Sequence, residues 1–84
     1  MKKTFTANLN GTVFHIEEDA YDQLQRYLAN IRAKFSGSSE AEEIMADIEA
    51  RIAELFTERL QGRQAVSLAD VEHVKQVMGQ PEDY

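Results

Sequence analysis

The chain has 84 residues, 43% of them apolar and 29% charged, and it contains no cysteine. This length holds one domain and the apolar share is that of a globular protein, while the missing cysteine excludes disulfides, thiolate nucleophiles and Cys-ligated zinc. A formal net charge of −6, with nine Lys and Arg residues scattered along the chain, disfavours nucleic acid and anionic lipid, because both bind proteins through clustered basic residues.

The first ten residues do not have the pattern of a targeting segment. Met1-Lys2-Lys3 is typical of the basic start of a signal peptide, but residues 4–10 are too polar to be the apolar stretch that must follow. No apolar run elsewhere is long enough to span a bilayer. We therefore expect the chain as given to be cytoplasmic, with no membrane contact of its own.

Residues 3–16 have the pattern of a β-hairpin. Phe5, Ala7 and Leu9 alternate with polar residues, as in a half-buried strand. Asn10-Gly11 then favours a two-residue type I′ turn, because both residues tolerate positive φ. The apolar residues of both strands must share one face, which predicts a single register. In that register Phe5 lies opposite Ile16, Ala7 opposite Phe14, and Leu9 opposite Thr12.

Three later segments carry apolar residues at steps of three and four, which predicts helices over residues 18–35, 40–60 and 68–78. Gly62 and Gly79 follow the second and third segments and are typical helix stops.

Each helix has a candidate N-terminal cap. Asp19 is the expected N-cap of the first helix. Ser39 with Glu42, and Ser67 with Asp70, have the spacing of capping boxes, in which each side chain accepts a hydrogen bond from the other residue's backbone.

Together these elements predict an α+β fold (ββααα): one domain over residues 1–84, with a β-hairpin followed by three helices. A lone hairpin is marginal in water, so the helices must cover its apolar face. We expect two antiparallel helices with the third laid across them. The side chains expected to be almost fully buried are Phe14, Leu28, Ile31, Ile48, Ile52, Leu55 and Val74.

The acidic and histidine side chains do not form a recognisable catalytic motif. General acid–base catalysis needs a carboxylate in a cleft with a displaced pKa, whereas these glutamates lie on predicted helix faces. Asp70 and His73 supply at most half of a helical metal site, and we interpret them as a cap and a surface residue. We expect no catalytic residue, no metal ligand and no cofactor.

Helices two and three have the short connection of a helix-turn-helix. Glu72, His73, Lys75 and Gln76 would then be the residues facing DNA. This set contains one lysine and no second basic anchor, so DNA binding is the alternative hypothesis rather than the leading one.

Residues outside the predicted core form the candidate interaction surface. Tyr27 lies at the margin of the first helix's apolar stripe, and aromatic side chains dominate binding hot spots. The unpaired edges of the hairpin invite another strand, so we also expect the domain to form a homodimer through the hairpin or the first two helices. The candidate interaction residues are Val13, His15, Tyr27, Glu43, Asp47, Glu54 and Glu58.

Several stretches together resemble the N-terminal segment of phage-shock-protein-C-type (PspC) membrane proteins of Bacteroidetes, which are often described as stress-responsive transcriptional regulators. The resemblance is carried by Leu9–Tyr21, Tyr27-Leu28, Asp47–Phe56 and Asp70–Tyr84. It implies that the segment precedes a membrane-spanning domain, at the cytoplasmic face of the inner membrane. The expected function is therefore a non-enzymatic interaction module of an envelope stress-response protein, whose partner is another protein or a second copy.

Overall fold

The hairpin forms as its sequence predicts. The computed structural model describes residues 3–81, which begin with strands β1 (Thr4–Leu9) and β2 (Thr12–Glu17) in antiparallel pairing. Asn10 and Gly11 connect them with φ angles of 52° and 93°, as a type I′ turn requires. The register is confirmed, with Phe5 opposite Ile16, Ala7 opposite Phe14 and Leu9 opposite Thr12.

A third strand, β3 (Ala65–Val66), was not expected from the sequence. It pairs in parallel with β2, with His15 beside Ala65, so the strand order is β1-β2-β3. Two residues are too few to show an alternating pattern, which explains why the sequence gives no sign of this strand. β3 covers only the part of β2 nearest the first helix, and it leaves the outer edge of β1 uncovered.

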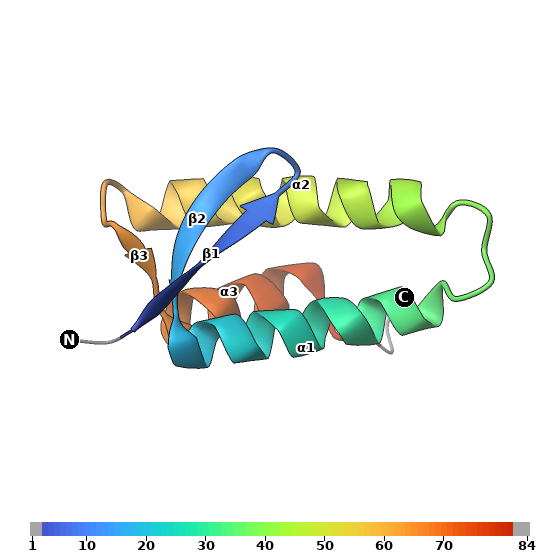
Figure 1. Cartoon of the computed structure of the whole chain (residues 1–84), viewed down its shortest axis with the longest axis horizontal. Coiled ribbons are helices and arrows are strands. Elements are labelled where there is room, and N and C mark those ends of the chain that lie inside the picture. Colours follow the sequence, from blue (N-terminus) through green and yellow to red (C-terminus); the bar gives the residue numbers. More distant parts are fainter. Residues whose placement is uncertain (1–2, 82–84) are drawn as a thin grey trace.

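Three helices complete the α+β fold: α1 (Glu18–Lys34), α2 (Ala41–Leu60) and α3 (Leu68–Met78). α1 and α2 are antiparallel, as expected, but α3 lies alongside α1 and runs in the same direction instead of crossing both long helices (Figure 1). One hydrogen bond joins α1 and α3, because the Tyr27 hydroxyl in the middle of α1 donates to the Gly79 carbonyl just beyond α3, at 2.6 Å.

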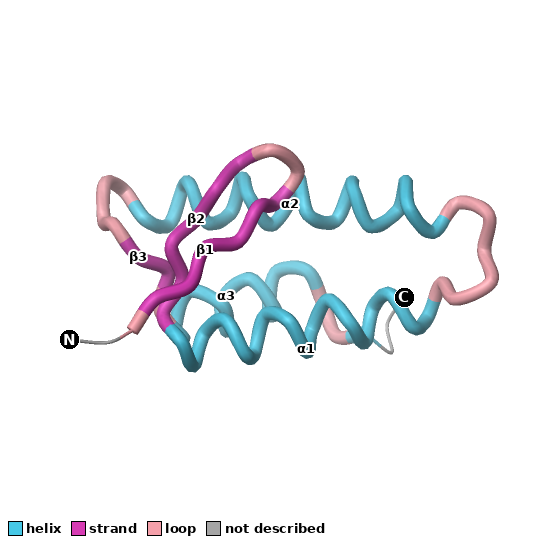
Figure 2. The backbone as a smooth tube through the Cα atoms, viewed as in Figure 1, coloured by secondary structure: helices cyan, strands magenta, loops and turns pink. Residues whose placement is uncertain are grey.

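The three strands cover only one end of the helical layer. Figure 2 shows the strands over the start of α1 and the later part of α2, while the other ends of both helices extend past the sheet toward the α1–α2 loop. The molecule is elongated as a result, at 41 × 21 × 20 Å.

Two of the three expected caps are wrong. Asp19 lies inside α1, because β2 runs directly into the helix and Glu17 occupies the N-cap position. Ser39 makes no capping box, because α2 begins one residue later than that box requires, with Glu40 as its N-cap. Ser38 accepts a hydrogen bond from the Glu40 N–H at 3.2 Å instead.

The core is confirmed except at one position. Leu28 is only partly buried, whereas its neighbour Tyr27 is 3% exposed. The reason is the placement of α3, which turns Tyr27 toward the end of α3 and leaves Leu28 at the border of the core. The fully buried centre joins the sheet to all three helices, and its large apolar side chains are Ile16, Leu24, Ile31, Ile52, Phe56, Val66, Val71 and Val74.

Candidate interaction surface

The most tightly bonded polar group in the described residues is the Asp70 carboxylate at the start of α3. One of its oxygens accepts hydrogen bonds from Arg59 Nε at 2.7 Å and Arg63 Nη2 at 2.8 Å. The other accepts from the Ser67 N–H at 2.8 Å and the Ser67 hydroxyl at 3.0 Å. The expected Ser67–Asp70 capping box is therefore confirmed, and two arginines extend it into a network that joins α2 to α3.

The electrostatics of this network identify it as structural. Burial raises the pKa of Asp70, but the hydrogen bonds from Arg63, Ser67 and Arg59 outweigh burial and lower that pKa from 3.8 to about 2. Hydrogen bonding to Asp70 raises the pKa of Arg63 in turn. Every acceptor position of the carboxylate is occupied from within the chain, so it offers nothing to a ligand.

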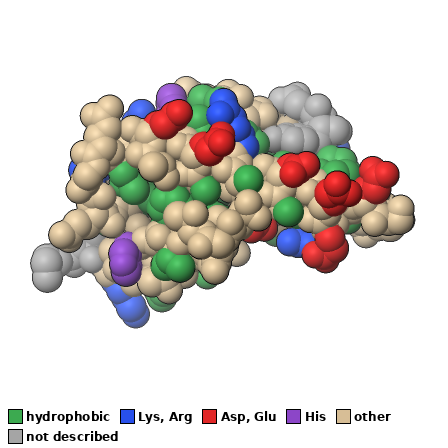
Figure 3. All heavy atoms as spheres, turned by 90° about the horizontal axis from the view of Figure 1, so that it is seen from above, with side chains coloured by type: hydrophobic (Ala, Val, Ile, Leu, Met, Phe, Trp, Pro, Cys, Tyr) green, Lys and Arg blue, Asp and Glu red, His purple; other side chains and the backbone are tan. Residues whose placement is uncertain are grey.

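The residues expected at the interaction surface do not form one site. Tyr27 is buried and hydrogen-bonded to Gly79, so its assignment to the surface is wrong. Val13, 59% exposed, and His15 lie on the solvent face of the sheet. In Figure 3 several acidic side chains lie toward the end formed by the start of α2, and others lie in the half of the molecule that carries the sheet. The exposed carboxylates expected at the surface all lie on α2: Glu43, Asp47, Glu54 and Glu58.

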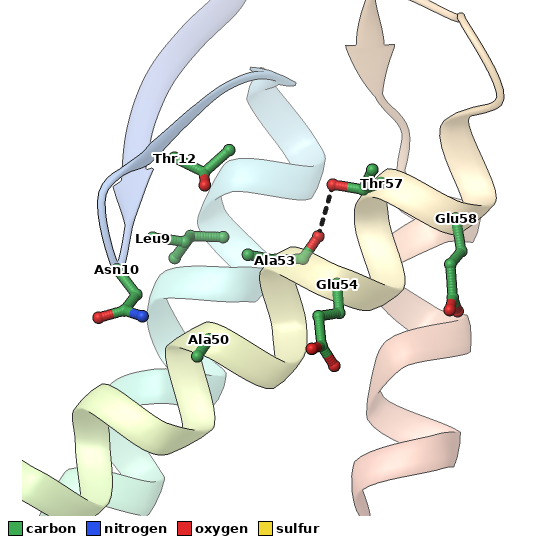
Figure 4. Close-up of a pocket in the computed structure, with 8 residues that line it drawn as sticks. All are labelled: Leu9, Asn10, Thr12, Ala50, Ala53, Glu54, Thr57 and Glu58. Atoms are coloured by element: carbon green, nitrogen blue, oxygen red, sulfur yellow. Dashed lines mark hydrogen bonds between the residues drawn. The ribbon is translucent and has the colours of Figure 1, made fainter.

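A groove of about 550 Å³ separates the hairpin tip from α2. Figure 4 shows Leu9 pointing toward Ala53, and Glu54 and Glu58 extending from α2 away from the hairpin. The Thr57 hydroxyl on this stretch already donates to the Ala53 carbonyl at 2.8 Å. The remaining lining comes from small or turn residues, namely Asn10, Thr12 and Ala50, so the groove offers few groups that would hold a ligand in one orientation.

The outer edge of β1 is open along its whole length, whereas β3 covers part of the outer edge of β2. In a hairpin closed by a two-residue turn, the residues beside the turn exchange both backbone hydrogen bonds, and every second pair after them does the same. Since Leu9 and Thr12 flank this turn, Ala7 and Phe5 also bond to β2. The N–H and C=O groups of Thr4, Thr6 and Asn8 therefore point outward, and the described chain places no strand beside them.

Features that natural proteins use to protect such an edge are missing from β1. The strand contains no proline and no charged residue, although charged side chains and prolines are the usual protection of an edge strand. Lys3 lies just before it, with its ammonium 5.5 Å from the centre of the Phe5 ring. The outward backbone groups are thus both unpaired and accessible.

Beneath this edge lies a hollow of about 320 Å³ between β1 and the helices. The helical wall is one face of α1 together with Glu49 of α2, whose neighbour Ala50 lines the groove at the hairpin tip with Leu9 and Asn10. Tyr21 and Leu28 give this wall partly exposed apolar surface, and Tyr21 also packs on Phe5 with ring centres 5.1 Å apart. The α1 residues that line the hollow are Tyr21, Gln25, Leu28 and Arg32.

Residues 3–81 show little sign of metal sites, membrane-spanning helices or unpaired basic groups near α3. Within that range no three His, Asp or Glu side chains are grouped so that they could hold a metal ion, and no helix is long and apolar enough to cross a membrane. His73 lies on α3, and its side chain is half-buried. Lys75, the one basic residue of α3, lies 3.9 Å from Glu72, and Arg59 and Arg63 contact Asp70. Basic groups near α3 therefore have acidic neighbours.

Comparison with protein-family models, with curated proteins and with solved structures finds no significant match to this chain.

Proposed function

We propose that this chain is a non-enzymatic protein-interaction module that binds an extended segment of its partner along the outer edge of β1. The observation that carries the proposal is the combination of outward backbone groups at Thr4, Thr6 and Asn8 with a partly apolar hollow directly beneath them. Adding a strand to an exposed sheet edge is a common mode of peptide recognition, in which backbone hydrogen bonds supply affinity and pockets for alternate side chains supply specificity.

The geometry suits this mode. The side chains of an added strand alternate, so every second one would enter the hollow between β1 and α1. Tyr21 and Leu28 would contact apolar side chains there, and Arg32 and Glu49 would contact polar ones. The network at Asp70, by contrast, stabilises the fold and takes no part in binding.

The resemblance of residues 9–21 and 47–56 to PspC-type proteins supports a cellular setting for this module. In our proposal the chain works at the cytoplasmic face of the inner membrane, within a longer membrane-anchored protein of the envelope stress response, and it passes the signal on by contact with another protein.

A substitution that removes one backbone N–H tests the proposal. Thr6→Pro removes the outward N–H at the centre of the edge, and proline is tolerated on edge strands when its nitrogen faces solvent. Thr6→Val is the matched control, since it changes the side chain and keeps the N–H. We expect affinity capture from the native host to retain the same protein on the wild-type and Thr6→Val domains and to lose it on Thr6→Pro.

Circular dichroism establishes that all three baits are folded before the capture. A partner held equally by Thr6→Pro and wild type would overturn strand addition at β1. Failure of all three baits to retain any protein would overturn the interaction function.

A further inference from the structure

The chemistry of the β1 edge points to a specific partner. We infer that β1 pairs with β1 of a second copy of this chain, antiparallel and centred on Thr6, so that two three-stranded sheets become one six-stranded sheet. This inference rests on the proposed function, because it uses the same edge and names the segment that occupies it.

The first argument is the register. A two-fold axis at Thr6 places Thr6 opposite its own copy and Thr4 opposite Asn8 of the other chain. All three outward residues of β1 then exchange backbone hydrogen bonds, because residues with outward groups face one another. Two-fold axes at Phe5 or Ala7 pair only two of the three outward residues. The strand is thus most self-complementary about its own middle.

The second argument is the distribution of charge. Residues 1–16 contain two lysines and no Asp or Glu. Seven of the nine Lys and Arg residues and all fifteen acidic residues lie in residues 17–84, which therefore carry a formal charge of −8. Two copies repel each other through residues 17–84, so β1, which contains no charged residue, is the surface through which they approach at the lowest electrostatic cost.

The third argument is the complementarity of Lys3 and Glu49. In the Thr6-centred register Lys3 of one copy lies beside Leu9 of the other, at the end of the hollow where Glu49 is found. Lys3 shares the helix-facing side of the strand with Phe5 and Ala7, because side chains alternate along β1. Glu49 is half-buried, and no described residue forms an ion pair with it.

The same register covers apolar surface. Phe5 of one copy lies opposite Ala7 of the other, and both side chains are only partly buried in the single chain. The dimer therefore forms two Lys3–Glu49 contacts and two Phe5–Ala7 contacts by symmetry.

Sedimentation equilibrium of the purified chain tests the inference, with Thr6→Val as the control. We expect wild type and Thr6→Val to dimerise in the micromolar range and Thr6→Pro to be at least tenfold weaker. Lys3→Glu and Glu49→Lys should each weaken the dimer several-fold, and the double variant Lys3→Glu/Glu49→Lys should recover most of the loss. Such recovery depends on the two side chains meeting and is independent of how either substitution affects folding.

Two results would overturn the self-pairing. One is a wild-type chain that stays monomeric at several hundred micromolar, and the other is a dimer that Thr6→Pro leaves unchanged. A monomeric chain whose capture of a different protein still depends on the Thr6 N–H would refute this inference and leave the proposed function standing. If the wild-type chain stays monomeric and no capture of another protein depends on the Thr6 N–H, both this inference and the proposed function are refuted.

Discussion

The α2–α3 junction, formed by Asp70 with Arg59, Arg63 and Ser67, differs from the outer edge of β1 in how its polar groups are hydrogen-bonded. At the junction, Asp70 is 1% exposed and four hydrogen bonds from the same chain reach its two oxygens. At the edge, the outward N–H and C=O groups of Thr4, Thr6 and Asn8 lie at the surface beside no other strand of the described chain. The junction is complete within one molecule, whereas the edge becomes complete only when a second segment is added.

This difference separates residues that hold the fold from residues that bind. Buried charges are tolerated only when they are paired and hydrogen-bonded, so the Asp70 network must form whenever the chain folds. Exposed backbone groups are hydrated in the free chain, so a partner strand exchanges water for protein hydrogen bonds at little cost. Substitutions at the two regions should therefore change different measured quantities.

The largest effect is expected at the junction. Asp70→Ala removes the capping box and both arginine contacts, and we expect it to lower the free energy of unfolding by about 2–3 kcal/mol. The loss stays in this range because Arg59 and Arg63 are partly exposed and regain water. Urea denaturation measures it. The control is Glu54→Ala, which breaks the exposed 3.2 Å pair with Arg51 and should cost less than about 0.5 kcal/mol. Equal losses in both variants would show that the junction is not integral to the fold.

Acid should weaken the junction selectively. Since the pKa of Asp70 is about 2 in the folded chain and 3.8 ordinarily, its stabilisation is fully present above pH 4 and is lost as the pH falls toward 2. At about 1.4 kcal/mol per pKa unit, the contribution is about 2 kcal/mol.

The measurement is the difference in unfolding free energy between wild type and Asp70→Asn, from urea titrations at pH 7, 4 and 2.5. We expect this difference to be constant from pH 7 to 4 and to shrink below pH 4. A difference independent of pH throughout would mean that folding does not lower the pKa of Asp70.

The smallest effect on stability is expected at the edge. Thr6→Pro should change the free energy of unfolding by less than about 1 kcal/mol, because its N–H makes no bond to β2. Ala7→Pro is the matched comparison, since the Ala7 N–H points at Phe14, and it should destabilise the chain clearly more. Thermal melts of the two variants compare their stabilities. If Thr6→Pro lowers the melting temperature as much as Ala7→Pro or more, the assignment of inward and outward backbone groups is wrong.

Local sequence signals account for most of the fold. Asn10-Gly11 determines the turn, and the turn determines which side chains share a face, so the hairpin register follows from two residues. The bounds of α3 follow from Ser67 before it and Gly79 after it. In each case the deciding interaction joins residues close together in the chain.

Apart from the N-caps at Asp19 and Ser39, the errors concern interactions between distant segments. Tyr27 occupies a border position in the helical pattern, and in the fold it is buried and donates a hydrogen bond to the carbonyl of Gly79, 52 residues later. Two residues of β3 become a strand only because β2 lies beside them. Asp70 could be predicted as a cap, but the approach of both arginines depends on how the α2–α3 connection turns. One signal was present, since Arg59 lies in the last turn of α2 and Arg63 follows four residues later, within that connection.

The interaction surface could be predicted only in part. The free hairpin edge follows from the sequence, because β1 contains neither proline nor charge. The hollow beneath it does not, since it depends on the angle at which α1 passes under the hairpin and places Tyr21 and Arg32 in the wall opposite β1.

The parallel pairing of β3 with β2 has a consequence for synthesis of the protein on the ribosome. His15 and its partner Ala65 are 50 residues apart in the chain. At about 5–20 residues per second, the hairpin leaves the ribosome several seconds before the strand that completes its sheet. During that interval both edges of the hairpin are open, and on a polysome the nascent hairpins of neighbouring ribosomes are close together. The pairing that we propose for finished chains would then begin between chains still being made.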